Sequence, residues 1–215
     1  NGLHGIGVAD SAAPSLENNL CVENAEVGIR YSDESGGTAR GNICSRNGLS
    51  GIIVRDQAQP TLEDNTSQEN GESGVAYFGS VGGVARNNVF VGNGFHGVDL
   101  YDTAAPLVER NTANANAQAG IRLSDDVTAR IAGNTCISNT LSGIIVRDQA
   151  QPTLVENVVR ESGESGIVFF GSSAGLAEGN VATASVLNGI GVNDDAAPTL
   201  RDNEISDNLE AGIGY

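Results

Sequence analysis

The chain has 215 residues, of which 39% are hydrophobic and 18% charged, and its formal net charge is −16 with a pI near 4.2. All eleven basic residues are arginine. A surface this acidic repels phosphate backbones, which excludes nucleic acid as an expected partner. No apolar run approaches the ~18 residues of a membrane-spanning helix, so no membrane span is expected.

A 23-residue unit repeats without insertion or deletion from Asn1 to Tyr215, in nine full copies and eight residues of a tenth. Position 5 of each unit is glycine, position 6 is Ile or Val, and position 8 is large and apolar, as in Gly5–Val8 of the first copy. Positions 16 and 21 form two further apolar columns. Short segments of this kind, without helical periodicity, predict three strands per unit. Each unit is therefore expected to be one coil of an all-β, three-sided solenoid.

Asparagine marks two corners of the coil. Position 19 is Asn in all nine full units, and position 1 is Asn in eight of ten. Asn tolerates left-handed backbone at tight corners, and its amides can bond to one another when coils stack. Both columns are therefore expected to be structural asparagine ladders.

The unit closely resembles the parallel β-helix repeat family, found in the superfamily of carbohydrate-binding proteins and sugar hydrolases. The motifs that carry the resemblance are G-I-x-V at Gly51–Val54, D-x-A-x-P-T-L-E at Asp56–Glu63 and N-x-x-x-x-N at Asn65–Asn70. The resemblance covers the entire chain and implies a right-handed parallel β-helix of about nine coils. It implies no single activity, since the same coil occurs in lyases, hydrolases, epimerases and adhesins.

The two ends of the chain show no amphipathic capping segment. We therefore expect a single β-helix domain over 1–215 that is a fragment of a longer, secreted protein in the extracellular space or the periplasm. Uncovered strand edges pair readily with other strands. End-to-end or face-to-face self-association is therefore expected.

Three cysteines lie in the apolar column at position 21. Cys21 and Cys44 occupy adjacent coils, within disulfide range, whereas Cys136 has no cysteine neighbour. Free Cys packs as a small hydrophobe. Buried thiols are favoured over a Cys21–Cys44 bridge.

The outward positions 7 and 9 of the first strand carry a candidate binding patch. Arg55 lies one coil before Phe78, with Tyr101 beyond, and Arg147 lies one coil before Phe170. Aromatic rings beside arginine suit sugars or a protein partner, while a surface cation–π pair is the structural alternative. A 92-residue duplication relates the two patches, since Leu49–Leu62 and Leu141–Leu154 are identical. The candidate ligand-binding residues are Ile53, Arg55, Phe78, Tyr101, Ile145, Arg147 and Phe170.

The fifth and sixth coils contain the candidate catalytic residues His96, Asp99, Asp102 and Arg122. Glycoside hydrolysis needs two carboxylates ~5–10 Å apart, which Asp99 and Asp102 could approach. The chain lacks the N-T-D, G-H-G and R-I-K motifs of polygalacturonases and the D-P-H-E motif of alginate epimerases. His96 shares its column with His4, for which no acidic companion is expected, and this favours solvated turn residues for both.

An aspartate column at position 10 offers the only candidate metal site. Its members are expected to cap turns by accepting hydrogen bonds from backbone N–H groups two residues on. The alternative is Ca²⁺ held by Asp102, Asp125 and Asp126, although one Asp per coil supplies few of the six to eight oxygens that Ca²⁺ prefers. No other cofactor is expected.

Two functional classes remain open. The first is a non-catalytic β-helical module or scaffold that binds a polysaccharide or a protein through the outer face of the G-I-x-V strand. The second is a polysaccharide lyase, glycoside hydrolase or epimerase that acts in a groove on the same face.

Overall fold

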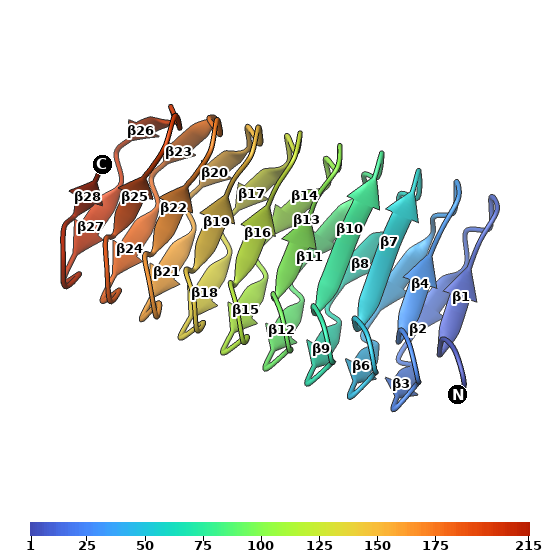
Figure 1. Cartoon of the computed structure of the whole chain (residues 1–215). Coiled ribbons are helices and arrows are strands. Elements are labelled where there is room, and N and C mark those ends of the chain that lie inside the picture. The colour runs from blue at the N-terminus through green and yellow to red at the C-terminus, as the bar shows by residue number, and fades with distance from the viewer.

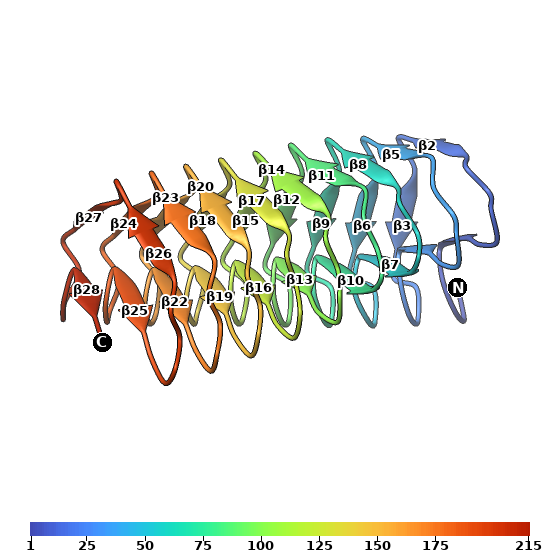
Figure 2. The ribbon, with the colours of Figure 1, turned by 90° about the horizontal axis from the view of Figure 1, so that it is seen from above.

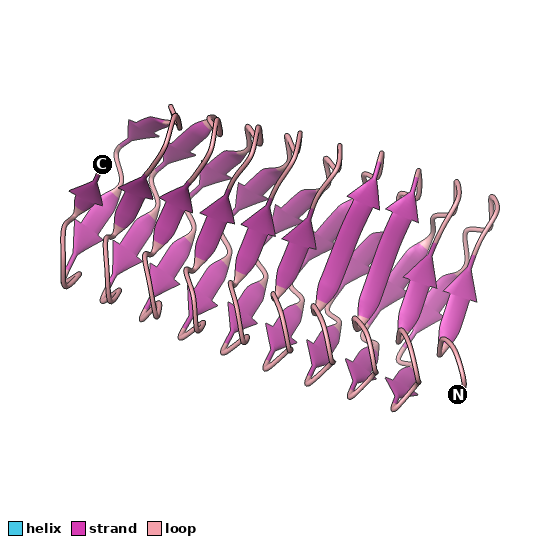
Figure 3. Cartoon of the chain, in the orientation of Figure 1, coloured by secondary structure: helices cyan, strands magenta, loops and turns pink.

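The computed structural model describes residues 1–215 as one elongated rod of stacked coils (Figure 1). Every regular element is a strand (Figure 3), and the structure has no helix long and apolar enough to cross a membrane. The coil rises by one strand spacing per repeat, so equivalent strands lie side by side along the rod (Figure 2). The prediction of an all-β parallel β-helix with three strands per 23-residue coil is confirmed.

The strands form three parallel sheets that run the length of the rod. The ten-stranded sheet consists of β1 (Ile6–Val8), β4 (Ile29–Tyr31), β7 (Ile52–Asp56), β10 (Val75–Gly79), β13 (Val98–Leu100), β16 (Ile121–Leu123), β19 (Ile144–Val146), β22 (Ile167–Phe169), β25 (Ile190–Val192) and β28 (Ile213–Gly214). A nine-stranded sheet consists of β2 (Ser15–Glu17), β5 (Thr38–Arg40), β8 (Thr61–Glu63), β11 (Val84–Arg86), β14 (Leu107–Glu109), β17 (Arg130–Ala132), β20 (Thr153–Val155), β23 (Leu176–Glu178) and β26 (Thr199–Arg201). The other nine-stranded sheet consists of β3 (Leu20–Val22), β6 (Ile43–Ser45), β9 (Thr66–Gln68), β12 (Val89–Val91), β15 (Thr112–Asn114), β18 (Thr135–Ile137), β21 (Val158–Arg160), β24 (Val181–Thr183) and β27 (Glu204–Ser206).

The register follows the repeat, because each residue pairs with its equivalent in the next coil. In the ten-stranded sheet, for example, Ile6 pairs with Ile29 and Val8 with Tyr31. The apolar columns at positions 6, 8, 16 and 21 point inward and, with small apolar residues at positions 12 and 14, form one continuous core of 37 buried residues. Positions 7 and 9 of the ten-stranded sheet are left on its outer face.

Both asparagine columns form the expected ladders. Asn111 accepts hydrogen bonds at Oδ1 from the backbone N–H and the Nδ2 of Asn88, each at 2.9 Å. Its own Nδ2 donates to the Ala85 carbonyl at 2.9 Å and to Asn134 Oδ1 at 3.0 Å. The second ladder runs from Asn1 to Asn139. These bonds satisfy the polar groups of corners that are otherwise buried.

The glycine at position 5 is required by the close approach of successive coils. A Cβ built on Gly28 would lie 2.5 Å from the Gly51 carbonyl oxygen and 2.9 Å from the Cys44 Cβ. No side chain fits at these distances, so the first strand can stack only if every coil has glycine here.

All three thiols are free and buried, which agrees with the favoured reading of the cysteine column. Cys21 and Cys44 pair directly across β3 and β6. Burial raises the pKa of the Cys136 thiol to about 12.

Candidate functional site

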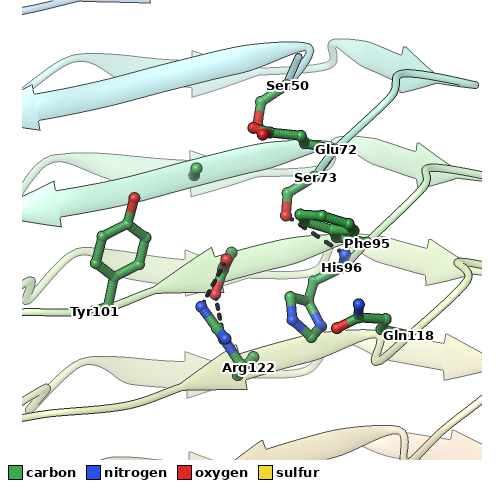
Figure 4. A pocket seen from close by; sticks show the side chains of 10 residues that line it. Ser50, Glu72, Ser73, Phe95, His96, Tyr101, Gln118 and Arg122 are labelled. Carbon is green, nitrogen blue, oxygen red and sulfur yellow. Dashed lines mark hydrogen bonds and ion pairs between the residues drawn. The ribbon is translucent and has the colours of Figure 1, made fainter. Parts of the chain in front are cut away.

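The outer face of the ten-stranded sheet is hollowed at the fourth to sixth coils. This central depression has a volume of about 330 Å³. Figure 4 shows Phe95, His96 and Gln118 on one side of it and Tyr101 on the other, with Arg122 between them. Its lining residues come from β10, β13, β16 and the turns that precede these strands and β7: Ser50, Glu72, Ser73, Ala76, Phe95, His96, Asp99, Tyr101, Gln118 and Arg122.

Asp99 and Arg122 form a bidentate ion pair at the floor of the central depression. Arg122 Nε donates to Asp99 Oδ1 at 2.7 Å, and Nη2 donates to Oδ2 at 3.0 Å. Burial raises the pKa of Asp99 above its ordinary value, although the Arg122 guanidinium opposes this shift. Arg122 contacts both carboxylate oxygens, so it fixes the orientation of Asp99 and supplies its counter-charge.

His96 is buried, so the expectation of a solvated turn residue is wrong for this position. Its Nδ1 accepts a hydrogen bond from the Ala119 backbone N–H at 3.1 Å. Burial, together with the charge of Arg122, lowers the pKa of His96 to about 3, so the ring is neutral at physiological pH. A neutral imidazole that accepts at Nδ1 carries its proton on Nε2 and therefore acts as a hydrogen-bond donor.

His4 also departs from the expectation, because it does have an acidic companion. Its Nδ1 lies 3.2 Å from Glu26 Oε2. Glu26 belongs to the following coil, and the sequence columns alone did not show that the two side chains converge.

Phe78 is only half-buried but is engaged by both neighbouring coils. Its ring stacks on Tyr101 with centroids 5.2 Å apart and an interplanar angle of 6°. The Arg55 guanidinium carbon lies 5.5 Å from the Phe78 centroid. Arg55 and Phe78 thus have the geometry of the surface cation–π pair, and ligand binding by these two residues stays a prediction. Burial, and then the nearby Asp99 charge, raise the pKa of Tyr101 to about 12, so its phenol stays protonated.

The duplicated patch differs from the first, because position 9 of the next coil is Asn193 where the first copy has Tyr101. Phe170 has no stacking partner and is 37% exposed. Arg147 turns to Asp148, with Nε 3.1 Å from Oδ2. These residues line a second depression of about 400 Å³ on the same sheet face, together with Ile145, Gly171 and Asp194. Ile53, by contrast, lies outside both depressions.

Asp102 does not line the central depression with Asp99. Its Oδ2 accepts the Gly79 backbone N–H at 2.9 Å, and its own N–H donates to Asp125 Oδ2 at 3.1 Å. The aspartate column thus caps turns as expected, but through the same position of the preceding coil and not through N–H groups two residues on. Asp102, Asp125 and Asp126 remain exposed, and no three His, Cys, Asp or Glu side chains lie close enough together to hold a metal ion. Ca²⁺ binding stays a prediction with no built site behind it.

Sequence reasoning missed Glu72, Phe95 and Gln118 as site residues, although all three occupy position 3 of their coils. The alternation of Leu or Phe with Glu or Gln at this position was the available signal. The turn that carries position 3 folds over the edge of the sheet face, which places these side chains beside Asp99 and Arg122.

The sequence matches the family described as "Right handed beta helix region" over residues 1–113 and 106–215. The chain belongs to this family. A search of curated proteins gives no match.

Among solved structures, the chain is similar to the A-module of the mannuronan C-5 epimerase AlgE4 of Azotobacter vinelandii. The two share 22% identity and a TM-score of 0.74 over 93% of this chain and 61% of that one. It is also similar to the periplasmic alginate epimerase AlgG, with 20% identity and a TM-score of 0.76 over 83% of this chain and 47% of that one. The chain thus spans less than two thirds of either structure, and at this identity the likeness establishes the fold.

Proposed function

We propose that the chain is a polysaccharide-binding β-helix module whose binding surface is the outer face of the ten-stranded sheet. The observation that carries this proposal is the central depression, which hydrogen-bonding side chains line together with two aromatic rings. Gln118 and Glu72 offer amide and carboxylate groups, and Phe95 and Tyr101 offer ring surface at either side. Sugars are bound by this combination of hydroxyl-binding groups and aromatic rings.

The second depression supports an extended ligand. Arg147 and Phe170 lie on the same sheet face, two and three coils beyond Tyr101 along the rod. A polymer that runs along this face can contact both depressions. The names of the two structural neighbours, which are enzymes of alginate, agree with a polysaccharide ligand. An extracellular or periplasmic location fits the same proposal, since one neighbour is periplasmic.

The geometry favours binding over catalysis. Asp99 has both oxygens committed to Arg122, and His96 uses its Nδ1 lone pair on the Ala119 N–H. Glu72 is the one remaining carboxylate in the depression, and its only side-chain hydrogen bond is a long one, 3.4 Å from Ser50 Oγ. A glycoside hydrolase needs two available carboxylates, and the central depression offers only Glu72.

The test is a glycan array followed by calorimetry with the glycan that binds best. Gln118→Ala and Phe95→Ala should each weaken binding about tenfold, because each removes a contact of ~1.5 kcal/mol. Gln118 makes no side-chain hydrogen bond within the protein, and the Phe95 side chain is among the exposed ones, so neither change should disturb the fold. Leu20→Ala, on the exposed surface of β3, is the matched control and should bind like the parent. Unchanged affinity in both site variants would refute the proposed surface.

A second candidate function is epimerisation or lysis of an acidic polysaccharide in the central depression. It is favoured by the gathering of His96, Asp99, Tyr101 and Arg122 in one place, together with the epimerase fold of the structural neighbours. In epimerisation a base removes the sugar C5 proton and an acid returns a proton to the opposite face of C5. In lysis the base removes the same proton, the C4–O4 bond breaks as the C4–C5 double bond forms, and the acid protonates the departing oxygen. Glu72 would be the base, and the protonated Tyr101 phenol would be the acid.

Incubation with mannuronan in D₂O separates the two functions. Epimerisation would place deuterium at C5, which NMR detects, and lysis would give unsaturated products. The binding module gives neither product. Turnover that is lost in Tyr101→Phe would establish the enzyme and overturn the non-catalytic proposal.

A further inference from the structure

The 92-residue duplication also relates the central depression to a cluster in the first two coils. His4, Glu26 and Arg30 occupy the positions of His96, Gln118 and Arg122, four repeats earlier. At the outward position 7, Gly7 stands where the later copy has Asp99, and at position 3 the acidic Glu26 stands where the later copy has the neutral Gln118. The strand pairing is the same, since Gly7 pairs with Arg30 across β1 and β4 as Asp99 pairs with Arg122 across β13 and β16.

Arg30 therefore lacks the carboxylate that neutralises its counterpart. Four arginines lie on the outer face of the ten-stranded sheet, and three of them pair with an aspartate within 3.1 Å: Arg55 with Asp56, Arg122 with Asp99, and Arg147 with Asp148. Arg30 forms no ion pair. Its Nη1 lies 2.9 Å from His4 Nε2, and its Nε is buried without a hydrogen-bond partner.

His4 does not neutralise this charge. A guanidinium can only donate, so His4 Nε2 accepts from Arg30, and the neutral ring carries its proton on Nδ1. Nδ1 lies 3.2 Å from Glu26 Oε2, but this contact does not have hydrogen-bond geometry. The Glu26 carboxylate is thus directed to His4 and leaves the Nε side of Arg30 free.

The space beside Arg30 is open. A Cβ built on Gly7 meets no atom within 4 Å. In the later copy this place holds the Asp99 carboxylate, which accepts from Arg122 Nε and Nη2. Arg30 has no carboxylate in the corresponding place, and its Nε is left without a hydrogen-bond partner.

We propose that Arg30 is a carboxylate-binding subsite, in which the carboxylate of a uronic acid residue takes the place that the Asp99 side chain has beside Arg122. This subsite rests on the proposed polysaccharide-binding function and restricts the expected ligand to an acidic polysaccharide. The subsite lies on the same sheet face as the central depression, four coil spacings or about 19 Å away. A bidentate guanidinium–carboxylate contact gives both affinity and a fixed orientation for the sugar.

The test follows the Arg30 side-chain Nε–H signal by NMR during titration with glucuronate, and with glucose as the neutral control. Glucuronate should shift this signal and glucose should not. Gly7→Asp supplies an internal carboxylate in the manner of Asp99, so it should weaken the glucuronate effect about tenfold or more. Gly7→Ala adds a Cβ without charge and should titrate like the parent.

No shift of the Arg30 signal, or an equal response in Gly7→Asp, would overturn the subsite. Glucose 6-sulfate as a further titrant shows whether any anionic sugar suffices; a response as strong as that to glucuronate would refute the carboxylate assignment. The proposed function is tested separately. If no glycan binds at the central depression while glucuronate still shifts the Arg30 Nε–H signal, the proposed function is refuted and the subsite is not.

Discussion

Arg122 lies directly beside Asp99 on the neighbouring strand and holds both oxygens of its carboxylate, at 2.7 and 3.0 Å. The side chains are 28% and 9% exposed, so this is a largely buried pair on an otherwise solvent-facing surface. The pair fixes the floor of the central depression. It also removes Asp99 from the set of groups that could act as a free base or nucleophile.

Arg122→Gln should destabilise the protein by ~3 kcal/mol, because it leaves the buried Asp99 carboxylate without its counter-charge. Thermal or denaturant unfolding measures this loss. Arg147→Gln is the matched control, since its pair with Asp148 is exposed and should contribute less than ~1 kcal/mol. Equal losses of unfolding free energy in the two variants would show that burial of the Asp99–Arg122 ion pair does not increase its contribution to stability.

Asp99 should also give the stability a specific pH dependence. Burial places its folded pKa above the ordinary value of 3.8. The folded state therefore binds this proton more tightly than the unfolded state, and stability from this group is lost as the pH rises from 3.8 through the folded pKa. Unfolding of the parent and of Asp99→Asn should be compared over this range, in which the parent should lose stability relative to the variant. A relative gain by the parent would contradict the raised pKa.

Asn111→Ala should cost ~1–3 kcal/mol, because it leaves the buried Asn88 backbone N–H without its acceptor and removes a donor from the Ala85 carbonyl. The Asn88 amide keeps its bond to the Leu62 carbonyl, and Asn134 Oδ1 keeps its bond from the backbone N–H of residue 111. Asn193→Ala removes an amide that has no side-chain hydrogen bond and should leave the melting temperature nearly unchanged. A melting temperature for Asn111→Ala equal to that of the control would rule out an energetic role for the ladder.

Phe78→Ala should mainly reduce stability, whereas Phe170→Ala should mainly weaken binding. Phe78 stacks on Tyr101 and contacts Arg55, so its loss should cost ~0.5–1.5 kcal/mol beyond the buried area and should loosen Tyr101. Phe170 has no ring partner, so its loss should change stability by less than ~0.5 kcal/mol but weaken binding of a long polysaccharide. Melting curves and calorimetry on the same two variants test both statements, and reversal of either effect would refute the distinction between the patches.

Cys136 should be unreactive in the folded protein. With its pKa raised to about 12, almost no thiolate exists at neutral pH, and the side chain is fully buried. A colour-forming disulfide reagent should label Cys136 only after denaturation. Labelling of Cys136 at the same rate in native and denatured protein would show that the core opens there.

The sequence by itself determined the coil, the three sheets, the core and both asparagine ladders. This was possible because each residue in a parallel β-helix stacks on the equivalent residue of the next coil, so a column in the repeat is a contact in space. Arg122 beside Asp99 and Cys21 beside Cys44 follow from this rule alone.

The tertiary structure decided which side chains of different columns meet. The turn before each first strand folds over the sheet edge, and this buries His96, brings Glu72 and Gln118 beside Arg122 and directs Glu26 to His4. Asp102, only three residues from Asp99, caps a turn because its own backbone is left-handed, with φ 59°, after the end of β13. These contacts depend on turn path and depth of burial, which the repeat pattern does not record.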